Sequence, residues 1–371
     1  MKKVDWILVV STLALLFGIG LSILILPQRS FSEEENRALT TWSTPSLQGL
    51  ADGSVTERLR SVYADQFPFR ASLISLKANL ERALGKKENN GIFFGRNGYL
   101  IPRSEYSDLS VAQKNLDALA ALENTAGIPC SLLIAPRSMD VMRACLPPLY
   151  ESDDAIFSLL EESDVTCTLP LDSLQAAAER GESVWYRTDH HWTTYGAYLA
   201  YAAVADSLGV SPFPLSFFQR EAVSDTFLGT SHSKVGMIRT TPDTVTLFRY
   251  KRDETAVLTD GETGETRLGF YEWDALAQKN QYELFLGGNV SRLSVSLAKE
   301  EDRPRLLLIK DSFACSLVPF LALHFDLELV DPRYYRGTLT DLLREERFDR
   351  ILTVHGLDTL ATDGSLSALL R

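Results

Sequence analysis

The chain has 371 residues, of which 45% are hydrophobic and 23% are charged, and its formal net charge is −12 at pH 7. This is the composition of a globular chain with a sizeable core, and its acidic balance argues against nucleic acid as a partner, because phosphates are bound by basic surfaces. The four cysteines form no C-x-x-C pair, which argues against a zinc knuckle or a redox motif and leaves both disulfides and free thiols open: Cys130, Cys145, Cys167 and Cys315.

The first predicted element is a membrane-spanning helix. Residues 7–26 carry no charge, and at ~1.5 Å per residue they span about 30 Å, the thickness of a bilayer core. Lys2 and Lys3 precede this stretch and glutamates follow it, so the N-terminus is expected in the cytoplasm. A cleaved signal peptide is the alternative, but its apolar region is usually about 7–15 residues long, so we favour an uncleaved anchor. The predicted regions are a cytoplasmic end at 1–6, the anchor at 7–26, a stalk at 27–55 and an extracytoplasmic domain at 56–371.

Beyond the stalk, helical and strand patterns alternate. A helical stretch at 55–84 is broken at Phe67-Pro68, and Asn97-Gly98 supplies the turn of a hairpin at 92–102. Residues 210–285 lack this rhythm and are predicted to form a loop-rich insertion with a hairpin at 244–250. Strand–helix alternation implies a mainly parallel sheet with helices on both faces. Further strands are predicted at 130–136, 305–311, 327–331 and 350–355, and further helices at 110–124 (capped by Ser110), 153–162, 171–180, 193–208, 314–325 and 338–346.

The sharpest local motif is Asp189-His190-His191-Trp192, which precedes the helix predicted from residue 193. A serine nucleophile needs an imidazole to accept its proton, and a carboxylate to orient that imidazole. An aspartate and a histidine two positions apart can project toward the same side. The alternative is an aspartate that caps the helix, with two histidines packed on Trp192.

A second motif lies where the strand at 305–311 gives way to a helix. Asp311 and Ser312 occupy this junction, and open α/β sheets place catalytic groups at the carboxyl ends of strands. Backbone N–H groups at the start of the next helix can stabilise an oxyanion. The alternative is that Asp311 or Ser312 simply caps the helix.

The third motif is Gly287-Gly288-Asn289. Glycines let the backbone approach a substrate closely, and Asn289 can donate a hydrogen bond to an oxyanion. Taken alone, this motif also fits an ordinary turn.

Together these motifs resemble the parts of an SGNH hydrolase, and the chain resembles the DHHW family, which is similar to the alginate O-acetyltransferase group of SGNH-like proteins. The resemblance implies a three-layer α/β/α domain after the N-terminal transmembrane helix. It covers most of the exported part, and the segments that carry it are ENR (35–37), DQFPFR (65–70), FFGRNGYLI (93–101), APR (135–137), DHHW (189–192), FLGGN (285–289) and IKDSF (309–313).

By this resemblance Asp189 orients His191, His191 is the base and Ser312 is the nucleophile, with His190 as the second choice of base. The sequence departs from the family at Lys310, where a glycine is common before Asp-Ser. The remaining candidate residues for the oxyanion and the substrate are Gly288, Asn289, Asp311, Arg137, Tyr195 and Ser231.

Two competing interpretations arise from the sequence. Ser231, in LGTSHSKVG, resembles the serine setting of one alginate relative, but no clear strand leads into it, so we favour Ser312. The Asp-His-His sequence at 189–191 is also similar to the motif of the metal-dependent DHH phosphoesterases. Those enzymes need more Asp and His ligands than this chain offers in metal-binding spacings, so we expect no metal and no other cofactor.

The predicted function is O-acetyl transfer to a cell-envelope or exported polysaccharide. The resemblance implies that a multi-pass membrane-bound O-acyltransferase supplies the acyl group. Two alternatives remain open, an acetylesterase of the same fold and a non-catalytic protein that binds glycan or serves as a scaffold. The convergence of Asp189, His191 and Ser312 distinguishes the enzymes from the scaffold.

Overall fold

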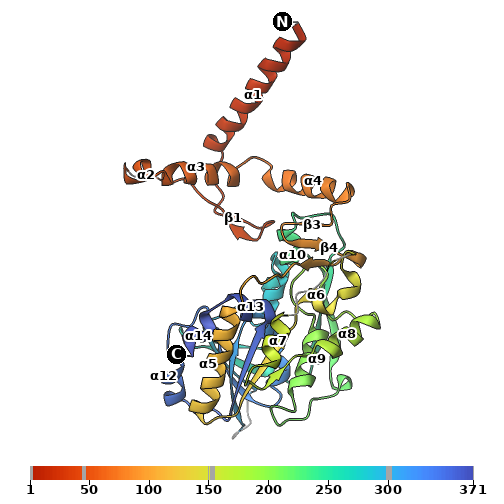
Figure 1. Ribbon diagram of the computed structural model, residues 1–371, viewed down its shortest axis with the longest axis vertical. Helices are drawn as coiled ribbons and strands as arrows, with labels where there is room; N and C mark the ends of the chain where they lie inside the picture. The colour runs from red at the N-terminus through yellow and green to blue at the C-terminus, as the bar shows by residue number, and fades with distance from the viewer. Residues whose placement is uncertain (1–2, 44–46, 149, 151–154, 298–302, 371) are drawn as a thin grey trace. The chain divides into compact units, whose positions relative to one another are not determined.

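The computed structural model describes residues 3–43, 47–148, 150, 155–297 and 303–370 (Figure 1). The chain divides into two compact units. Unit 1 comprises residues 1–90 and 232–240, and unit 2 comprises residues 91–231 and 241–371.

Unit 2 is built on an eight-stranded sheet with the strand order β11-β10-β12-β14-β13-β15-β6-β7. The strands from β14 to β7 run parallel, and β12, β10 and β11 continue the sheet in antiparallel fashion. The strands are β6 (Cys130–Ala135), β7 (Cys167–Thr168), β10 (Ala256–Asp260), β11 (Thr266–Leu268), β12 (Arg292–Leu297), β13 (Arg305–Lys310), β14 (Asp326–Val330) and β15 (Arg350–Gly356).

Successive residues of the central strands enter two separate hydrophobic cores. On β13, Leu306 and Leu308 belong to one core, whereas Leu307 and Ile309 belong to the other, as the period of two in a strand requires. The first core is covered by α8 (Leu171–Glu179), α9 (Thr194–Val204) and α11 (Val318–Leu321). The second is covered by α5 (Ser110–Ala126), α7 (Ala155–Glu161), α12 (Leu339–Glu345), α13 (Leu357–Thr362) and α14 (Ser365–Leu369). The three-layer α/β/α prediction is therefore confirmed.

The region 210–285 is more regular than predicted. A long strand, β8 (Gln219–Phe227), pairs with β9 (Asp243–Arg249), and β10 and β11 join the main sheet. The prediction missed β8 because most of its residues are exposed and polar, so it shows no apolar alternation. A strand does lead into the Ser231 segment, contrary to the prediction, because β8 ends directly before it and Ser231 lies in α10 (Thr230–Lys234).

Several predicted boundaries differ from the structure. The helix expected over 314–325 is a 3₁₀ helix, η7 (Ser312–Ser316), followed by the short α11, whose first turn contains Pro319. Proline lacks an N–H group and disrupts helix continuation, which explains the division. The helix from residue 193 ends at Val204, and Asp108 rather than Ser110 accepts the N–H bond at the start of α5. The start of the helix predicted at 153–162 lies outside the described residues. The remaining elements of unit 2 are β4 (Ile92–Phe94), η1 (Arg96–Gly98), β5 (Leu100–Pro102), α6 (Ser138–Val141), η2 (Arg143–Cys145), η3 (Leu215–Phe217), η4 (Asp253–Thr255), η5 (Trp273–Ala277) and η6 (Gln281–Leu284).

Unit 1 begins with α1 (Lys3–Ile25), which within the described chain is the one helix long and apolar enough to span a membrane. The segment predicted as a stalk contains a small two-stranded sheet and a short helix. The helical stretch predicted at 55–84 consists of two helices separated at Phe67-Pro68, as expected. The elements are β1 (Phe31–Ser32), β2 (Arg37–Ala38), α2 (Leu47–Ala51), α3 (Ser54–Asp65), α4 (Arg70–Ala83) and β3 (Glu88–Asn89).

Candidate active site

The candidate site forms where β13 ends and where the segment before α9 folds back on itself. Asp311 follows β13, and Ser312 begins η7. On the other side, an antiparallel bridge joins Trp185 to Trp192, so the chain between them forms a tight loop that carries the Asp-His-His sequence. Thr193 caps α9 through its side-chain oxygen, which accepts from the Gly196 N–H. Regular structure on both sides therefore fixes the two motifs.

The structure brings three of the predicted side chains into one hydrogen-bonded row. His191 Nδ1 lies 2.6 Å from Asp189 Oδ1, and His191 Nε2 lies 2.8 Å from Ser312 Oγ. Since an ionised carboxylate can only accept, Nδ1 carries the proton, and Nε2 is left to accept from the Ser312 hydroxyl. Asp189 and His191 are buried, whereas Ser312 is only partly buried. The arrangement has the geometry of a base that can deprotonate Ser312.

Asp189 is held by more than its histidine partner. Its Oδ2 accepts from the Thr230 N–H at 2.7 Å and the Thr230 hydroxyl at 2.9 Å, and its Oδ1 also accepts from the His191 N–H. Burial alone would raise the pKa of Asp189, but the neighbouring histidines and these hydrogen bonds lower it below its usual range. At Gly229 a Cβ atom would lie 2.3 Å from Asp189, so only glycine fits there.

Trp192 and Tyr282 hold His191 against the serine turn, which is Asp311 together with η7. The Trp192 indole N–H donates to the Phe313 carbonyl at 3.1 Å and lies 3.0 Å from Ser316 Oγ, inside η7. Tyr282 stacks on the His191 ring with centroids 3.8 Å apart, and its hydroxyl donates to the Ser312 carbonyl. Both aromatic side chains are buried, so the distance between His191 and Ser312 is set by packing.

Asp311 supports the turn that carries Ser312 through both of its carboxylate oxygens. Its Oδ1 accepts from the Phe313 N–H at 2.9 Å and its Oδ2 from the Gly356 N–H at 2.7 Å. Although burial would raise the pKa of Asp311, the nearby His355 and the backbone donors lower it. Both carboxylate oxygens of Asp311 therefore accept from backbone N–H groups on either side of the turn that carries Ser312.

Gly288 and Asn289 lie against the other end of the serine turn. Lys310, fully buried, donates to Asn289 Oδ1 at 3.1 Å, and the Cys315 thiol lies 3.8 Å from the Gly288 carbonyl. Lys310 also lies 3.7 Å from Asp331. Lys310, which stands where a glycine is common in the related family, therefore places a buried ammonium group beside Asn289 and fixes the Asn289 amide.

The other predicted residues lie apart from the row. Arg137 is buried and binds Asp140 at 2.6 and 2.8 Å, and the Tyr195 hydroxyl donates to Glu182. Ser231 is buried, and its hydroxyl has no hydrogen-bond partner within the described part of the chain. The four cysteines are free thiols in the structure.

His190 stands beside the row rather than in it. Its ring lies 3.8 Å from the His191 ring, and its Nδ1 is 2.6 Å from Thr230 Oγ1. Because the Thr230 hydroxyl gives its proton to Asp189, it accepts from His190 Nδ1–H. Burial and the neighbouring His191 lower the pKa of His190.

Asp189, His190 and His191 also form a group that could hold a metal ion, since one ligand atom from each lies within 4.8 Å of the others. However, Asp189 Oδ1 and His191 Nδ1 are already hydrogen-bonded to each other, and His190 Nδ1 is hydrogen-bonded to Thr230 Oγ1. A metal here would have to replace the contacts that orient His191.

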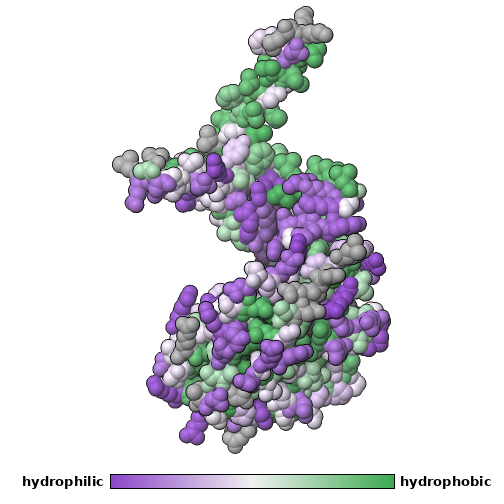
Figure 2. All heavy atoms as spheres, viewed as in Figure 1, coloured by the Kyte–Doolittle hydropathy of each residue, from purple (hydrophilic) through white to green (hydrophobic). Residues whose placement is uncertain are grey.

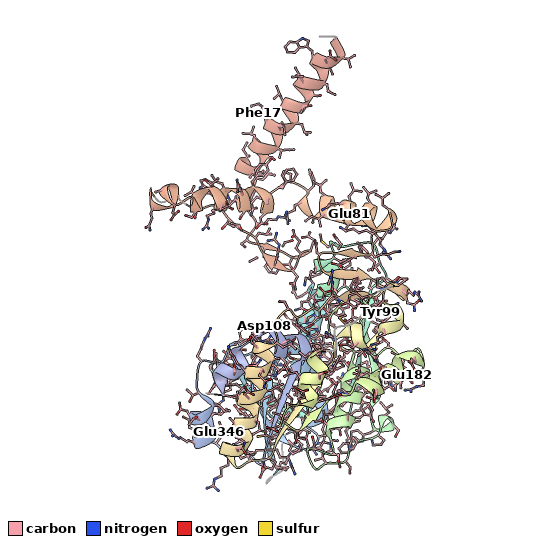
Figure 3. All side chains as sticks on the ribbon, in the orientation of Figure 1. Phe17, Glu81, Tyr99, Asp108, Glu182 and Glu346 are labelled. Carbon is pink, nitrogen blue, oxygen red and sulfur yellow. The ribbon has the colours of Figure 1, made fainter. Side chains whose placement is uncertain are left out.

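Two cavities adjoin the segment that leads into the Asp-His-His loop. One, of about 700 Å³, is lined by Tyr99 and Glu182, both labelled in Figure 3, and the other has a volume of about 470 Å³. They share Glu182, Ser183 and Arg187. Tyr195 lines the smaller cavity. The linings of these two cavities do not include Asp189, His191 or Ser312, all three of which the structure describes.

The fold is that of the SGNH-hydrolase-like α/β proteins. A DHHW family protein from Eubacterium siraeum DSM 15702 superimposes with a TM-score of 0.62 and 21% identity, covering 76% of this chain and 95% of its own. Bacillus cereus PatB1, determined with a sulfonyl adduct, gives a TM-score of 0.62 at 16% identity and covers 76% of this chain and 100% of its own. At these identities the likeness concerns the fold alone.

Sequence comparison finds similarity over about half of the chain. Residues 170–330 match the family described as DHHW protein. "Probable alginate O-acetylase AlgJ" of Pseudomonas syringae pv. tomato is 26% identical over 182 residues, 44% of this chain and 45% of that protein. The protein of the same name from Pseudomonas putida is 25% identical over 188 residues, 45% of this chain and 49% of that protein. The chain thus spans about half the length of these relatives, and the predicted resemblance is confirmed.

Acidification is expected to destabilise the fold between pH 7 and pH 5. Burial lowers the pKa of His355 below its ordinary value, so in this window the unfolded chain binds more protons than the folded chain. The free energy of unfolding should therefore fall as the pH falls, by up to about 1.4 kcal/mol per pH unit for this one group. Denaturant unfolding of the full-length protein in detergent should show a smaller pH slope for His355→Gln. Equal slopes would contradict this assignment.

Proposed function

We propose that the protein is a membrane-anchored O-acetyltransferase that modifies a cell-envelope or exported polysaccharide through Ser312, His191 and Asp189. The observation that carries the proposal is His191, whose two ring nitrogens bridge Asp189 and Ser312 at 2.6 and 2.8 Å. The similarity to proteins named as alginate O-acetylases supports acetyl transfer as the chemistry. The anchor is oriented with its N-terminus in the cytoplasm, which puts the site outside the cell.

In the first half-reaction Ser312 Oγ attacks the carbonyl carbon of an acetyl donor. His191 Nε2 accepts the hydroxyl proton as the new C–O bond forms, and Asp189 stabilises the imidazolium. The tetrahedral intermediate then collapses, the bond to the leaving group breaks, and His191 returns the proton to that group. The product is an acetyl ester on Ser312. By resemblance, the donor is loaded by a multi-pass membrane-bound O-acyltransferase.

The negative oxygen of the intermediate needs hydrogen-bond donors. The Ser312 N–H, at the start of η7, is one candidate, and the Gly288–Asn289 segment supplies the others. Lys310 holds the Asn289 carbonyl oxygen at 3.1 Å, which leaves the amide N–H₂ as the free end. In a 3₁₀ helix residues three apart lie on the same side, so Cys315, which touches Gly288, and Ser312 share one side of η7.

In the second half-reaction a glycan hydroxyl gives its proton to His191 Nε2 and attacks the acetyl carbonyl. The acetyl–Ser312 bond breaks, and the serine recovers its proton. Water in place of the glycan would give an acetylesterase.

The test is to trap the acetyl-enzyme. Full-length protein in detergent is mixed with p-nitrophenyl acetate, and intact mass and peptide mapping should find one acetyl group on Ser312. Addition of an acetyl-accepting oligosaccharide should move that group to a hydroxyl faster than water removes it. A chelator should leave the yield unchanged. An acetyl group on Ser231, turnover that persists in Ser312→Ala, or loss of activity with chelator would each overturn the proposal.

A further inference from the structure

An exposed apolar stripe follows one side of α4. Phe69, Leu73, Leu76, Leu80 and Leu84 are spaced by three and four residues, so they lie on one face of the helix. Their exposed fractions range from 48% to 88%. Figure 2 shows apolar atoms on the surface of this part of the molecule. The stripe is therefore a continuous apolar surface about 20 Å long, since α4 has 14 residues.

The opposite face of α4 is already occupied within unit 1. Ala78 is buried and lies beside Gly236, the Ser75 hydroxyl donates to the Met237 carbonyl at 2.8 Å, and Asn79 Oδ1 accepts from the Arg239 N–H at 3.0 Å. This packing fixes which face of the helix points outward. The outward stripe is thus held in place as a rigid surface.

The start of α4 is tied to the chain just beyond the membrane helix. Arg70 binds Glu35 at 2.8 Å, Arg37 binds Asp65 at 2.6 Å, and Gln66 bonds the backbone of Arg29 in both directions. These contacts use the ENR and DQFPFR motifs, which the acyl chemistry leaves unexplained.

The length of the connection keeps α4 near the bilayer. The last turn of α1 closes with a bond from the Leu26 N–H to Ser22, and Arg29 follows three residues later. Three residues of extended chain reach at most about 11 Å. The polar region of one leaflet is about 5–8 Å thick, so the corner between α3 and α4 lies at or next to the lipid headgroups.

Composition at this corner matches a membrane surface. After α1, nine large apolar side chains of the described part of unit 1 are exposed between residues 31 and 84, against four in the described part of unit 2. Several are aromatic, which is typical of the membrane interface: Phe31, Trp42, Tyr63 and Phe69. Residues 54–87 also carry seven Lys and Arg against three Asp and Glu, in a chain whose formal charge is −12. An anionic lipid surface complements this local excess.

We propose that the outward stripe of α4 lies in the headgroup region of the bilayer that α1 spans, with Lys77, Lys86 and Lys87 near anionic phosphates. Interfacial helices of this kind bury their apolar face about 5–10 Å into the boundary between headgroups and acyl chains. Unit 1 is then held by two membrane contacts, one across the bilayer and one along its surface. The glutamate–arginine network between residues 35–37 and 65–70 makes the two contacts one rigid element.

The experiment places a photo-crosslinking residue, p-benzoylphenylalanine, at Leu76 in full-length protein reconstituted into nanodiscs of phosphatidylcholine and phosphatidylglycerol. The matched control carries the same residue at Arg82, about 120° or more around α4 from every stripe residue, on the side where its guanidinium donates to the Arg239 carbonyl. Irradiation should attach phospholipid at position 76 at least about fivefold more than at position 82. Replacing Lys77, Lys86 and Lys87 with glutamine should reduce the preference for phosphatidylglycerol.

Three outcomes would overturn the proposal. Equal lipid attachment at positions 76 and 82 would show that the stripe does not enter the lipid. A covalent dimer would identify a second copy as the occupant, and in native membranes an adduct with another membrane protein would identify a partner groove. Because no activity is measured, the result is independent of the acetyl-transfer chemistry.

Discussion

His191→Ala is expected to lower kcat/KM for acetyl-ester turnover by about 10⁴-fold or more, because Ser312 then has no base for its proton. Adding Ser312→Ala should cause little further loss. The two side chains act as one unit joined by a 2.8 Å hydrogen bond, so removing either removes the same step. Steady-state kinetics of both single variants and the double variant measure this non-additivity.

Two other histidines serve as controls for this prediction. His190→Ala should retain activity within about tenfold, because the nitrogen nearest the row is bonded to Thr230 and not to Ser312. The His324 ring is hydrogen-bonded to the Tyr201 hydroxyl, so His324→Ala should have an activity still closer to that of the parent protein. A loss in His190→Ala that matches that in His191→Ala would instead make the first histidine the base.

Much of this site could be predicted from local sequence. The apolar run before Asp311 marks a buried strand, and the carboxyl end of a central parallel strand is where an α/β sheet presents reactive groups. The two-residue spacing of Asp189 and His191 allowed them to face the same side, and the family resemblance paired them. Both features depend on residues that are close together in the sequence, so one sequence is enough to identify them.

The supporting residues could not be predicted, because their contacts join distant parts of the chain. Thr230 binds Asp189 across 41 positions, and Trp192 meets Ser316 across 124. The LGTSHS segment was noticed for Ser231, yet its contribution to the geometry is Thr230, together with the close approach of Gly229. Tyr282 stood in a region predicted as loop, so nothing in its surroundings indicated that it would stack on His191.

The largest effect apart from the base and nucleophile is expected for Asp189→Asn, which should lower kcat by about 10⁴-fold with little change in the fold. Two Thr230 donors contact Oδ2, so an asparagine must keep its carbonyl oxygen on that side. Its N–H₂ group then faces His191 Nδ1, where the carboxylate had accepted. His191 must carry its proton on Nε2 instead, and Nε2–H cannot accept the proton of Ser312.

Because the expected loss comes from a change in the His191 tautomer, the measurement has to report the tautomer as well as the rate. Nitrogen NMR of the His191 ring should find Nδ1 protonated in the parent and Nε2 protonated in Asp189→Asn. Asp253→Asn is the matched control, since Asp253 is equally buried but binds Arg249 and stands outside the row. It should cost stability and leave kcat within a few fold. If Asp189→Asn keeps the Nδ1–H tautomer and still loses activity, the charge of the carboxylate, and not its orientation of His191, is what the reaction requires.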